Sequence, residues 1–159
     1  MGNCNKKIEI LDCTLRDGGY VNNWRFDLKL ARETYRALSK AGVDIVELGY
    51  HGTEKYFDAS KYGLFRFCSA KTIDEVTKGI DGAKMALMVD HGKYDIEDLL
   101  QYKDSRVSII RIAFHKNKLK EALKKVEEIK NIGFKVSVNL MGYANYLESE
   151  KQEAVNLIE

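Results

Sequence analysis

Arg16 and Asp17 stand side by side at the end of an apolar run, and two glycines follow them in the stretch LDCTLRDGGY. A carboxylate is a hard oxygen ligand for a divalent cation. A guanidinium beside it can stabilise negative charge on an oxygen bound to that cation. Gly18 and Gly19 predict a tight turn that lets a ligand approach the backbone. The pair therefore has the residue types that enolate chemistry needs.

Other polar residues fall inside runs that otherwise have the composition of buried strands. Because side chains alternate along a strand, each run can be divided into two faces. One face is apolar and is expected to pack against helices. The other face carries polar side chains that would converge inside a barrel, namely Asp12, Glu47, Arg111, Ser137 and Asn139.

Arg111 requires an acidic partner if it is buried, because an unpaired buried charge is strongly destabilising. Glu47 and Asp12 are the candidate partners. For Asp12 and Arg111, a purely structural layer of ion pairs in the barrel floor stays open as an alternative. Glu47 lies nearer the C-terminal end of its strand and is predicted to be functional.

Five apolar or β-branched runs predict the strands that would position these side chains. They occupy residues 8–13, 44–49, 84–89, 107–113 and 134–140. Their nearly continuous Val, Ile, Leu and Met content is typical of strands covered on both faces.

Amphipathic patterns between these runs predict helices. The first has Asp27 as its N-cap and stops at Gly42, and the second has capping-box spacing between Thr72 and Glu75. Three more are expected from Asp95 to residue 100, over residues 119–129, and from Ser149 to the end of the chain. The last pattern has no C-cap, which suggests a truncated chain.

Alternation of strands and helices requires a parallel sheet with right-handed crossovers. An open doubly wound sheet and part of an eight-stranded barrel are the two candidates. Five units in 159 residues are roughly 32 residues each, so eight would need the roughly 250 of a complete barrel. We therefore expect an α/β fold in which residues 1–159 form the first five β/α units of an incomplete (β/α)8 TIM barrel, as part of one catalytic domain.

Composition excludes several classes of partner. The net charge is +2, and the lysines of residues 116–130 alternate with Glu and apolar residues, so no nucleic acid is expected. No stretch has the length of a membrane span or a signal peptide. Cys4, Cys13 and Cys68 form no metal-type or paired spacing and are predicted to be reduced thiols in a cytoplasmic protein.

Residues 50–70 form the one long irregular segment, rich in aromatic side chains, after the second predicted strand. Loops in that position lie on the face where barrel sites form. Alternatively, residues 50–70 form a surface loop that is packed by its own Tyr and Phe side chains. The three histidines, His51, His91 and His115, also follow strands, but no His-x-His pair occurs, and solvent exposure is the simpler interpretation.

The segment DCTLRDGG, followed by a helix that ends in SKAGVDIVELG, resembles the metal-dependent barrel lyases and synthases. That superfamily includes 3-hydroxy-3-methylglutaryl-CoA lyase, isopropylmalate synthase and 4-hydroxy-2-oxovalerate aldolase. The longer run through VNNWRF is most similar to the aldolase-like members. The resemblance covers the whole chain as the N-terminal part of the barrel. The motifs LRDG and GVDIVELG together are specific evidence for it, whereas either motif alone is weak evidence.

By position, the resemblance implies that Asp17 is a divalent-metal ligand and that Arg16 stabilises an enolate or enolpyruvate. Glu47 matches an acidic position that lines the same site. The implied substrates are 2-oxo acids or acyl-CoA esters, and the implied metal is magnesium or manganese. The family's other metal ligands form a His-x-His pair on a later strand, which this chain does not reach.

Tyr20 stands where related aldolases have the histidine that serves as the base. A phenol can take that role only if its pKa is lowered. The base is therefore left open among Tyr20, His115 and a group beyond residue 159. His115 and Asn139, at the ends of the fourth and fifth predicted strands, are predicted to bind substrate together with Arg16.

These features predict an enzyme that, in full-length form, uses a divalent metal for retro-aldol cleavage of a 4-hydroxy-2-oxo acid. The fragment alone is expected to be inactive. A Claisen-type synthase acting on acetyl-CoA and a 2-oxo acid is the alternative enzyme. From another class, a non-catalytic barrel fragment could self-associate or bind a partner, because five strands leave two unclosed edges. Expected partners are the 2-oxo acid and further copies of the chain through those edges.

Overall fold

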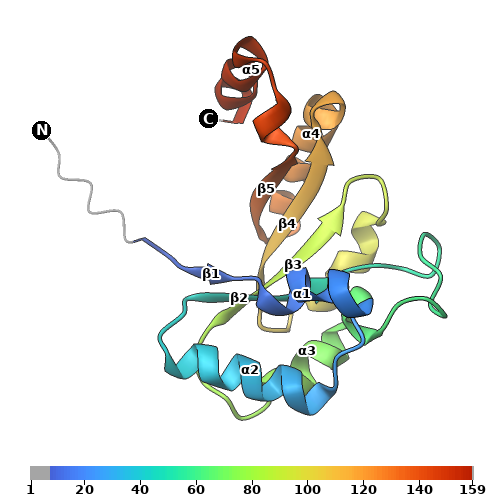
Figure 1. Ribbon diagram of the computed structural model, residues 1–159, viewed down its shortest axis with the longest axis vertical. Coiled ribbons are helices and arrows are strands. Elements are labelled where there is room, and N and C mark those ends of the chain that lie inside the picture. The colour runs from blue at the N-terminus through green and yellow to red at the C-terminus, as the bar shows by residue number, and fades with distance from the viewer. Residues whose placement is uncertain (1–7, 159) are drawn as a thin grey trace, which may run out of the picture.

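The computed structural model describes residues 8–158, so Cys4 and its predicted thiol lie outside the described residues. Five parallel strands form one sheet in the order β1-β2-β3-β4-β5. Their bounds are β1 Leu11–Asp12, β2 Ile45–Tyr50, β3 Lys84–Asp90, β4 Val107–His115 and β5 Lys135–Met141. Figure 1 shows that β1 and β2 lie across the molecule while β4 and β5 turn away from them, so the sheet curls.

This strand order decides between the two predicted architectures. A doubly wound sheet reverses its order at a switch point. Here every strand instead pairs with its neighbours in sequence, from β1 at one edge to β5 at the other. The described residues thus form a curled α/β half-barrel.

Helices and short 3-10 turns connect the strands. The helices are α1 Thr14–Asn22, α2 Leu28–Lys40, α3 Ala70–Thr77, α4 Leu119–Asn131 and α5 Glu148–Ile158. The 3-10 helices are η1 Leu64–Arg66, η2 Ile96–Tyr102, η3 Lys116–Lys118 and η4 Tyr143–Asn145. Within residues 8–158, no helix has the length and apolar character needed to cross a membrane.

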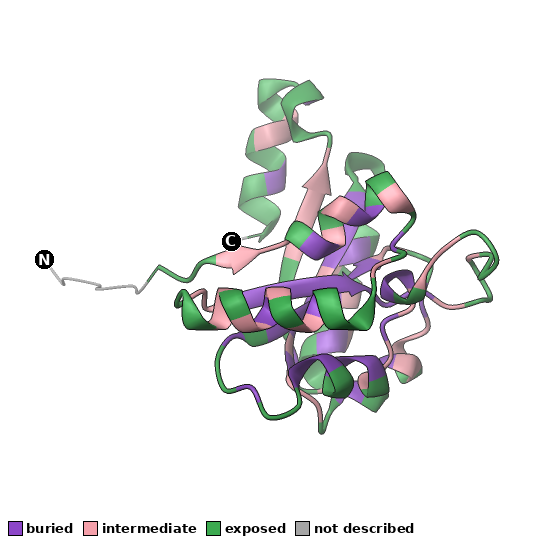
Figure 2. Ribbon diagram, turned by 60° about the horizontal axis from the view of Figure 1, so that its bottom comes forward, coloured by how far each residue is buried: buried purple, intermediate pink, exposed green. Residues whose placement is uncertain are grey.

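The main hydrophobic core lies between the sheet and its covering helices. Buried strand side chains such as Leu48, Leu87 and Ile110 share a cluster with Tyr35 of α2 and Ile129 of α4. Figure 2 shows β2 buried along its whole length, while the helices are buried along one stripe. A second cluster on the other face of the sheet joins Leu11, Ile45, Ala86 and Ile109. The sheet thus buries apolar side chains on both faces, and its inner face also carries the charged Glu47 and Arg111.

Several predicted helix boundaries are confirmed and others are wrong. Asp27 is the N-cap of α2, and its side chain accepts a hydrogen bond from the backbone N–H of Lys29 at 2.6 Å. The predicted Thr72 cap of α3 is wrong, because the hydroxyl of Ser69 accepts the bond from the Thr72 N–H at 3.2 Å. Asp95 precedes the 3-10 helix η2 and makes no side-chain cap hydrogen bond.

The largest departure concerns the first strand and the segment after it. The run predicted as a strand over residues 8–13 is reduced to Leu11–Asp12, and LRDGG lies inside helix α1 rather than in a tight turn. Leu11 pairs with Ile45, so Leu11 shares the inner face and Asp12 does not. Asp12 instead accepts hydrogen bonds from the N–H and hydroxyl of Thr14, at 3.0 and 2.9 Å. The prediction that Asp12 faces the barrel interior is therefore wrong.

Candidate active site

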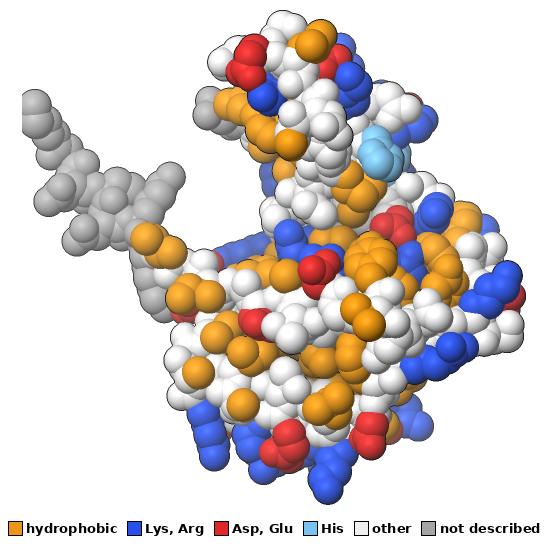
Figure 3. All heavy atoms as spheres, viewed as in Figure 1, with side chains coloured by type: hydrophobic (Ala, Val, Ile, Leu, Met, Phe, Trp, Pro, Cys, Tyr) orange, Lys and Arg blue, Asp and Glu red, His pale blue; other side chains and the backbone are white. Residues whose placement is uncertain are grey.

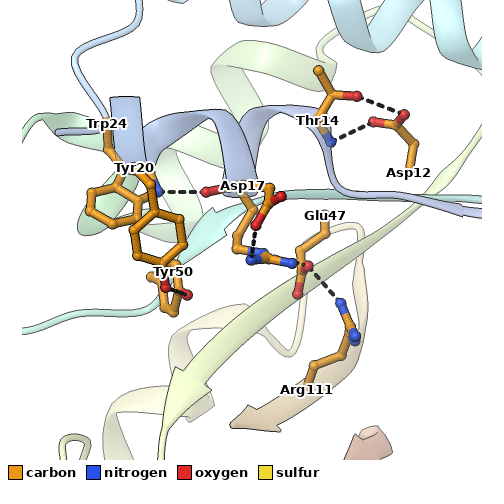
Figure 4. A network of polar contacts seen from close by, with 9 residues as sticks. Asp12, Thr14, Asp17, Tyr20, Trp24, Glu47, Tyr50 and Arg111 are labelled. Carbon is orange, nitrogen blue, oxygen red and sulfur yellow. Dashed lines mark hydrogen bonds and ion pairs between the residues drawn. The ribbon is translucent and has the colours of Figure 1, made fainter. Parts of the chain in front are cut away.

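Glu47 is the centre of a buried charge network on the inner face of the sheet. Its side chain is fully buried in β2, and its Oε2 accepts hydrogen bonds from Arg16 Nε at 3.0 Å and Arg111 Nη1 at 2.7 Å. Figure 4 shows Arg111 reaching Glu47 from β4. The predicted pairing of Arg111 with a carboxylate is thus confirmed for Glu47. Glu47 Oε1 is buried and has no hydrogen-bond partner among the described residues.

Helix α1 positions the Arg-Asp pair beside this network. Arg16 Nη1 donates to Asp17 Oδ1 at 2.7 Å, while its Nε is held by Glu47. These carboxylates, Glu47 first among them, raise the pKa of Arg16 against the lowering effect of burial, so the guanidinium stays charged. Among the described residues, no hydrogen bond engages Arg16 Nη2. Arg16 is therefore a fixed cation with one nitrogen available to a ligand.

Tyr20 follows Arg16 by one helical turn, so both side chains lie on the same side of α1. The Tyr20 hydroxyl is 2.8 Å from the hydroxyl of Tyr50, at the end of β2. Burial is the main cause that raises the pKa of Tyr50 well above its ordinary value, and the hydrogen bond between Tyr50 and Tyr20 adds to it. Tyr50 therefore keeps its proton, and Tyr20, which is 64% exposed, is the member of the pair open to a ligand.

Trp24 explains the second glycine of LRDGG. The indole Nε1 donates to the backbone carbonyl of Arg16 at 2.8 Å, which brings the ring flat against α1. A Cβ on Gly19 would lie 2.1 Å from atoms of that ring. Trp24 and Asn23 both have positive φ, at 58° and 55°, so the chain turns sharply at the end of α1. Gly19 is needed here for close packing, not for a turn.

The long segment after β2 brings a further cation to the site. Arg66 of η1 is buried, and its Nη2 donates to Asp90 Oδ2, at the end of β3, at 2.5 Å. Its guanidinium carbon lies 3.9 Å from the ring centroids of both Tyr50 and Phe57, as in cation–π contacts. Residues 50–70 pack on their own aromatic side chains, as in the surface-loop interpretation. They also place Arg66 beside the candidate site, as in the active-face interpretation. The sequence indicated this segment but not Arg66 within it.

Three other predicted residues lie on β4 and β5. Ser137 of β5 is opposite Arg111 in the sheet and is exposed, and Asn139 is opposite Ala113 and half-buried. His115 ends β4 and is exposed. Among the described residues the structure records no hydrogen bond from these three side chains to Arg16, Asp17 or Glu47. The predicted roles of Asn139 and His115 in substrate binding stay predictions.

The histidines differ from the expected solvent exposure. His51 is buried, its Nδ1 lies 2.8 Å from the hydroxyl of Tyr102, and burial lowers the pKa of His51. His91 is partly buried with its Nε2 3.6 Å from Glu121 Oε2. Exposure is confirmed for His115 and wrong for His51, because the segment after β2 folds over His51 and covers it. Cys13 and Cys68 are free thiols.

Asp17 is the predicted ligand for a divalent cation. Its side chain is 64% exposed, and no hydrogen bond engages its Oδ2 within residues 8–158. A carboxylate oxygen in this state suits a hard cation as one ligand. Among the described residues, no three His, Cys, Asp or Glu side chains gather as a metal-binding group. Asp17 thus offers one carboxylate oxygen that fits a divalent cation among the described residues.

A parallel half-barrel with charged side chains near the C-terminal ends of its strands has the layout of a barrel enzyme's active face. In Figure 3, acidic, basic and hydrophobic side chains meet on the face where Figure 1 places α1. No protein-family model matches the chain. Individual proteins do match it.

The chain is similar to the 4-hydroxy-2-oxovalerate aldolases. It is 28% identical over 134 residues to 4-hydroxy-2-oxovalerate aldolase 6 of Rhodococcus jostii, covering 84% of this chain and 38% of that protein. It is 33% identical over 106 residues to the aldolase of Geobacillus genomosp. 3, covering 67% of this chain and 31% of that one. The predicted resemblance is confirmed. The chain spans about a third of the length of these curated relatives.

A solved structure agrees with these relatives. The N-terminal domain of a candidate aldolase from Bacteroides vulgatus superposes with a TM-score of 0.78 at 29% identity, covering 93% of this chain and 50% of that chain. KGPDC from Streptococcus mutans superposes with a TM-score of 0.52 at 12% identity, covering 94% of this chain and 70% of that chain, which supports the fold alone.

Proposed function

We propose that this chain is the N-terminal part of a (β/α)8 barrel aldolase that cleaves a 4-hydroxy-2-oxo acid. The observation that carries the proposal is the Arg16 guanidinium, fixed between Glu47 and Asp17 with Nη2 available, in a chain similar to aldolases. A cation fixed in this way can meet the negative charge of an enolate without rearranging, which is the largest source of stabilisation in such reactions.

Tyr20, Tyr50 and Arg16 have different roles in the proposed retro-aldol reaction. As the base, Tyr20 must act as a phenolate: its oxygen, held by the hydroxyl of Tyr50, takes the proton from the C4 hydroxyl of the substrate. The C4 oxygen forms the carbonyl of an aldehyde as the C3–C4 bond breaks, and the electron pair of that bond moves to C3 and the C2 oxygen as an enolate. Arg16 donates a hydrogen bond from Nη2 to that oxygen as its charge grows. Protonation at C3 then yields a 2-oxo acid.

Asp17 would hold a divalent cation, magnesium or manganese, with ligands from later strands. Such a cation polarises a bound oxo group as a Lewis acid. Asn139 and His115, at the ends of β5 and β4, would contact the substrate from the opposite side of the half-barrel. Glu47 holds the Arg16 guanidinium in place, and its buried Oε1 has no hydrogen-bond partner among the described residues.

Substitution of Arg16 in the full-length protein tests this function. Pyruvate release from 4-hydroxy-2-oxovalerate with manganese present is expected to fall by about two to three orders of magnitude in Arg16→Met, because a preorganised donor to the enolate oxygen is lost. Arg36→Met is the control, since Arg36 lies on α2 and forms only a 3.7 Å pair with Glu33. Equal rates for wild type and Arg16→Met would remove Arg16 from the mechanism.

A further inference from the structure

A small cavity opens next to the Tyr20 hydroxyl, beyond the Glu47 network. Its volume is about 250 Å³, and it is lined by Tyr20, Asn23, Trp24, Tyr62, Arg66 and Asp90. Tyr20 connects it to the proposed reaction centre. Four residues of helix place Tyr20 about 6 Å along α1 from Arg16. A ligand of a few carbon atoms held by Arg16 and Tyr20 would therefore extend into this cavity.

The polar wall of the cavity is preorganised. Arg66 is 5% exposed and stacks between the rings of Tyr50 and Phe57, with Trp24 at 5.1 Å, so its guanidinium cannot easily turn. One nitrogen donates to Asp90, and among the described residues no hydrogen bond engages the other two side-chain nitrogens. A buried arginine with unused donors at a cavity wall is suited to a polar ligand group.

The charges indicate which polar group fits. Asp90 is ion-paired to Arg66, so the pair brings little net positive charge to the cavity. A carboxylate or phosphate would gain from Arg66 but would be repelled by Asp90 beside it. A neutral hydroxyl group both donates and accepts, and the guanidinium and the carboxylate offer the complementary donor and acceptor side by side.

We propose that this cavity binds the aldehyde-forming end of the substrate and that this end carries a hydroxyl group next to C4. The proposal rests on the proposed function, and it deepens it by naming the substrate class as 4,5-dihydroxy-2-oxo acids. With the oxo group at Arg16 and the C4 hydroxyl at Tyr20, the C5 substituent lies at Arg66 and Asp90. Cleavage then releases a 2-oxo acid and a hydroxyaldehyde.

The test compares two substrates that differ by one hydroxyl group, 4-hydroxy-2-oxopentanoate and 4,5-dihydroxy-2-oxopentanoate. Pyruvate release by the full-length protein gives kcat/KM for each. We expect the dihydroxy acid to be preferred at least about tenfold, because a site built to hydrogen-bond a hydroxyl discriminates against an analogue that lacks it. Arg66→Met is expected to abolish the preference, and Arg36→Met to retain it.

A second variant covers the case in which Arg66→Met does not fold. Asp90→Asn keeps the size of the side chain and weakens the acceptor, so the preference should fall without disappearing. Equal kcat/KM for the two acids, or a preference that survives both variants, would overturn the inference and leave the aldolase function standing. Failure to release pyruvate from either acid would overturn the proposed function itself.

Discussion

Glu47 shows how one buried carboxylate organises the candidate site. A fully buried charge is tolerated only when charged partners surround it, and Glu47 has two, from α1 and from β4. The network therefore ties the first β/α unit to the fourth strand. It also fixes Arg16, so the same contacts serve stability and the proposed chemistry.

Removal of Arg111 should destabilise the fold strongly. Arg111→Met leaves Glu47 buried with Arg16 as its one guanidinium partner, and we expect the free energy of unfolding to fall by about 3 kcal/mol. Chemical denaturation measures this change. Arg36→Met should change it by less than about 1 kcal/mol, because the pair of Arg36 with Glu33 is at the surface.

A double-mutant cycle measures the contribution of the contact between Glu47 and Arg111 separately from the cost of each single substitution. The combination of Glu47→Gln with Arg111→Met removes both charges, so its cost should be clearly smaller than the sum of the single costs. Additive costs would mean that the contact between the two side chains contributes nothing to stability.

The identity of the proposed base can be tested by a pair of substitutions. Tyr20→Phe removes the hydroxyl that contacts Tyr50, and we expect pyruvate release by the full-length protein to fall by about two orders of magnitude. His115→Gln should have little effect on the catalytic rate constant, because His115 is exposed at the far end of β4 and is expected to bind substrate only. The reverse result would make His115 the base.

At the scale of elements, α1 decides the geometry of the site, and its two glycines have different environments. A Cβ on Gly18 would lie 3.6 Å from Phe26, an ordinary contact, whereas one on Gly19 would collide with Trp24. Gly18→Ala is expected to stabilise the protein by about 0.5–1 kcal/mol, through better helix propensity. Gly19→Ala should destabilise it by about 1–3 kcal/mol, as overpacking does.

Thermal denaturation of both alanine variants compares these effects directly. Because the two positions are adjacent in one helix, each variant is the control for the other. Similar melting temperatures for the two would contradict the packing of Trp24 on α1.

The sequence predicted the site residues correctly where they lie on long strands and incorrectly where the strand is short. Strands β2 and β4 are six and nine residues long, so their alternation placed Glu47 and Arg111 on one face correctly. Strand β1 has two residues, and its parity failed for Asp12. Two successive glycines predicted a turn where the ring of Trp24 stabilises a helix. That contact is tertiary, and spacing along the chain carries no signal for it.

Arg66 was missed for a related reason. It lies in an irregular segment without a periodic pattern, and its partner Asp90 is at the end of a strand distant in sequence. The aromatic composition of residues 50–70 was the one feature that indicated the surroundings of this cation.

At the scale of the whole molecule, the described sheet has two open edges, β1 and β5. We propose that these edges pair with further strands, either the remaining strands of a barrel or a second copy of the chain. Unpaired backbone groups at a sheet edge favour such pairing. Sedimentation velocity of the 159-residue chain should show association that increases with concentration, and a monomer at all concentrations would contradict pairing between copies.

The position of Trp24 has a consequence for experiment. It is the single tryptophan of the chain, it lines the cavity beside Tyr20, and the cation of Arg66 lies 5.1 Å from its ring. Indole emission depends on nearby charge and on exposure to water, so the tryptophan fluorescence of the unlabelled 159-residue chain originates at the proposed substrate pocket. The molecule thus carries its own optical probe, which can report ligand occupancy in real time without dye, tag or coupled enzyme.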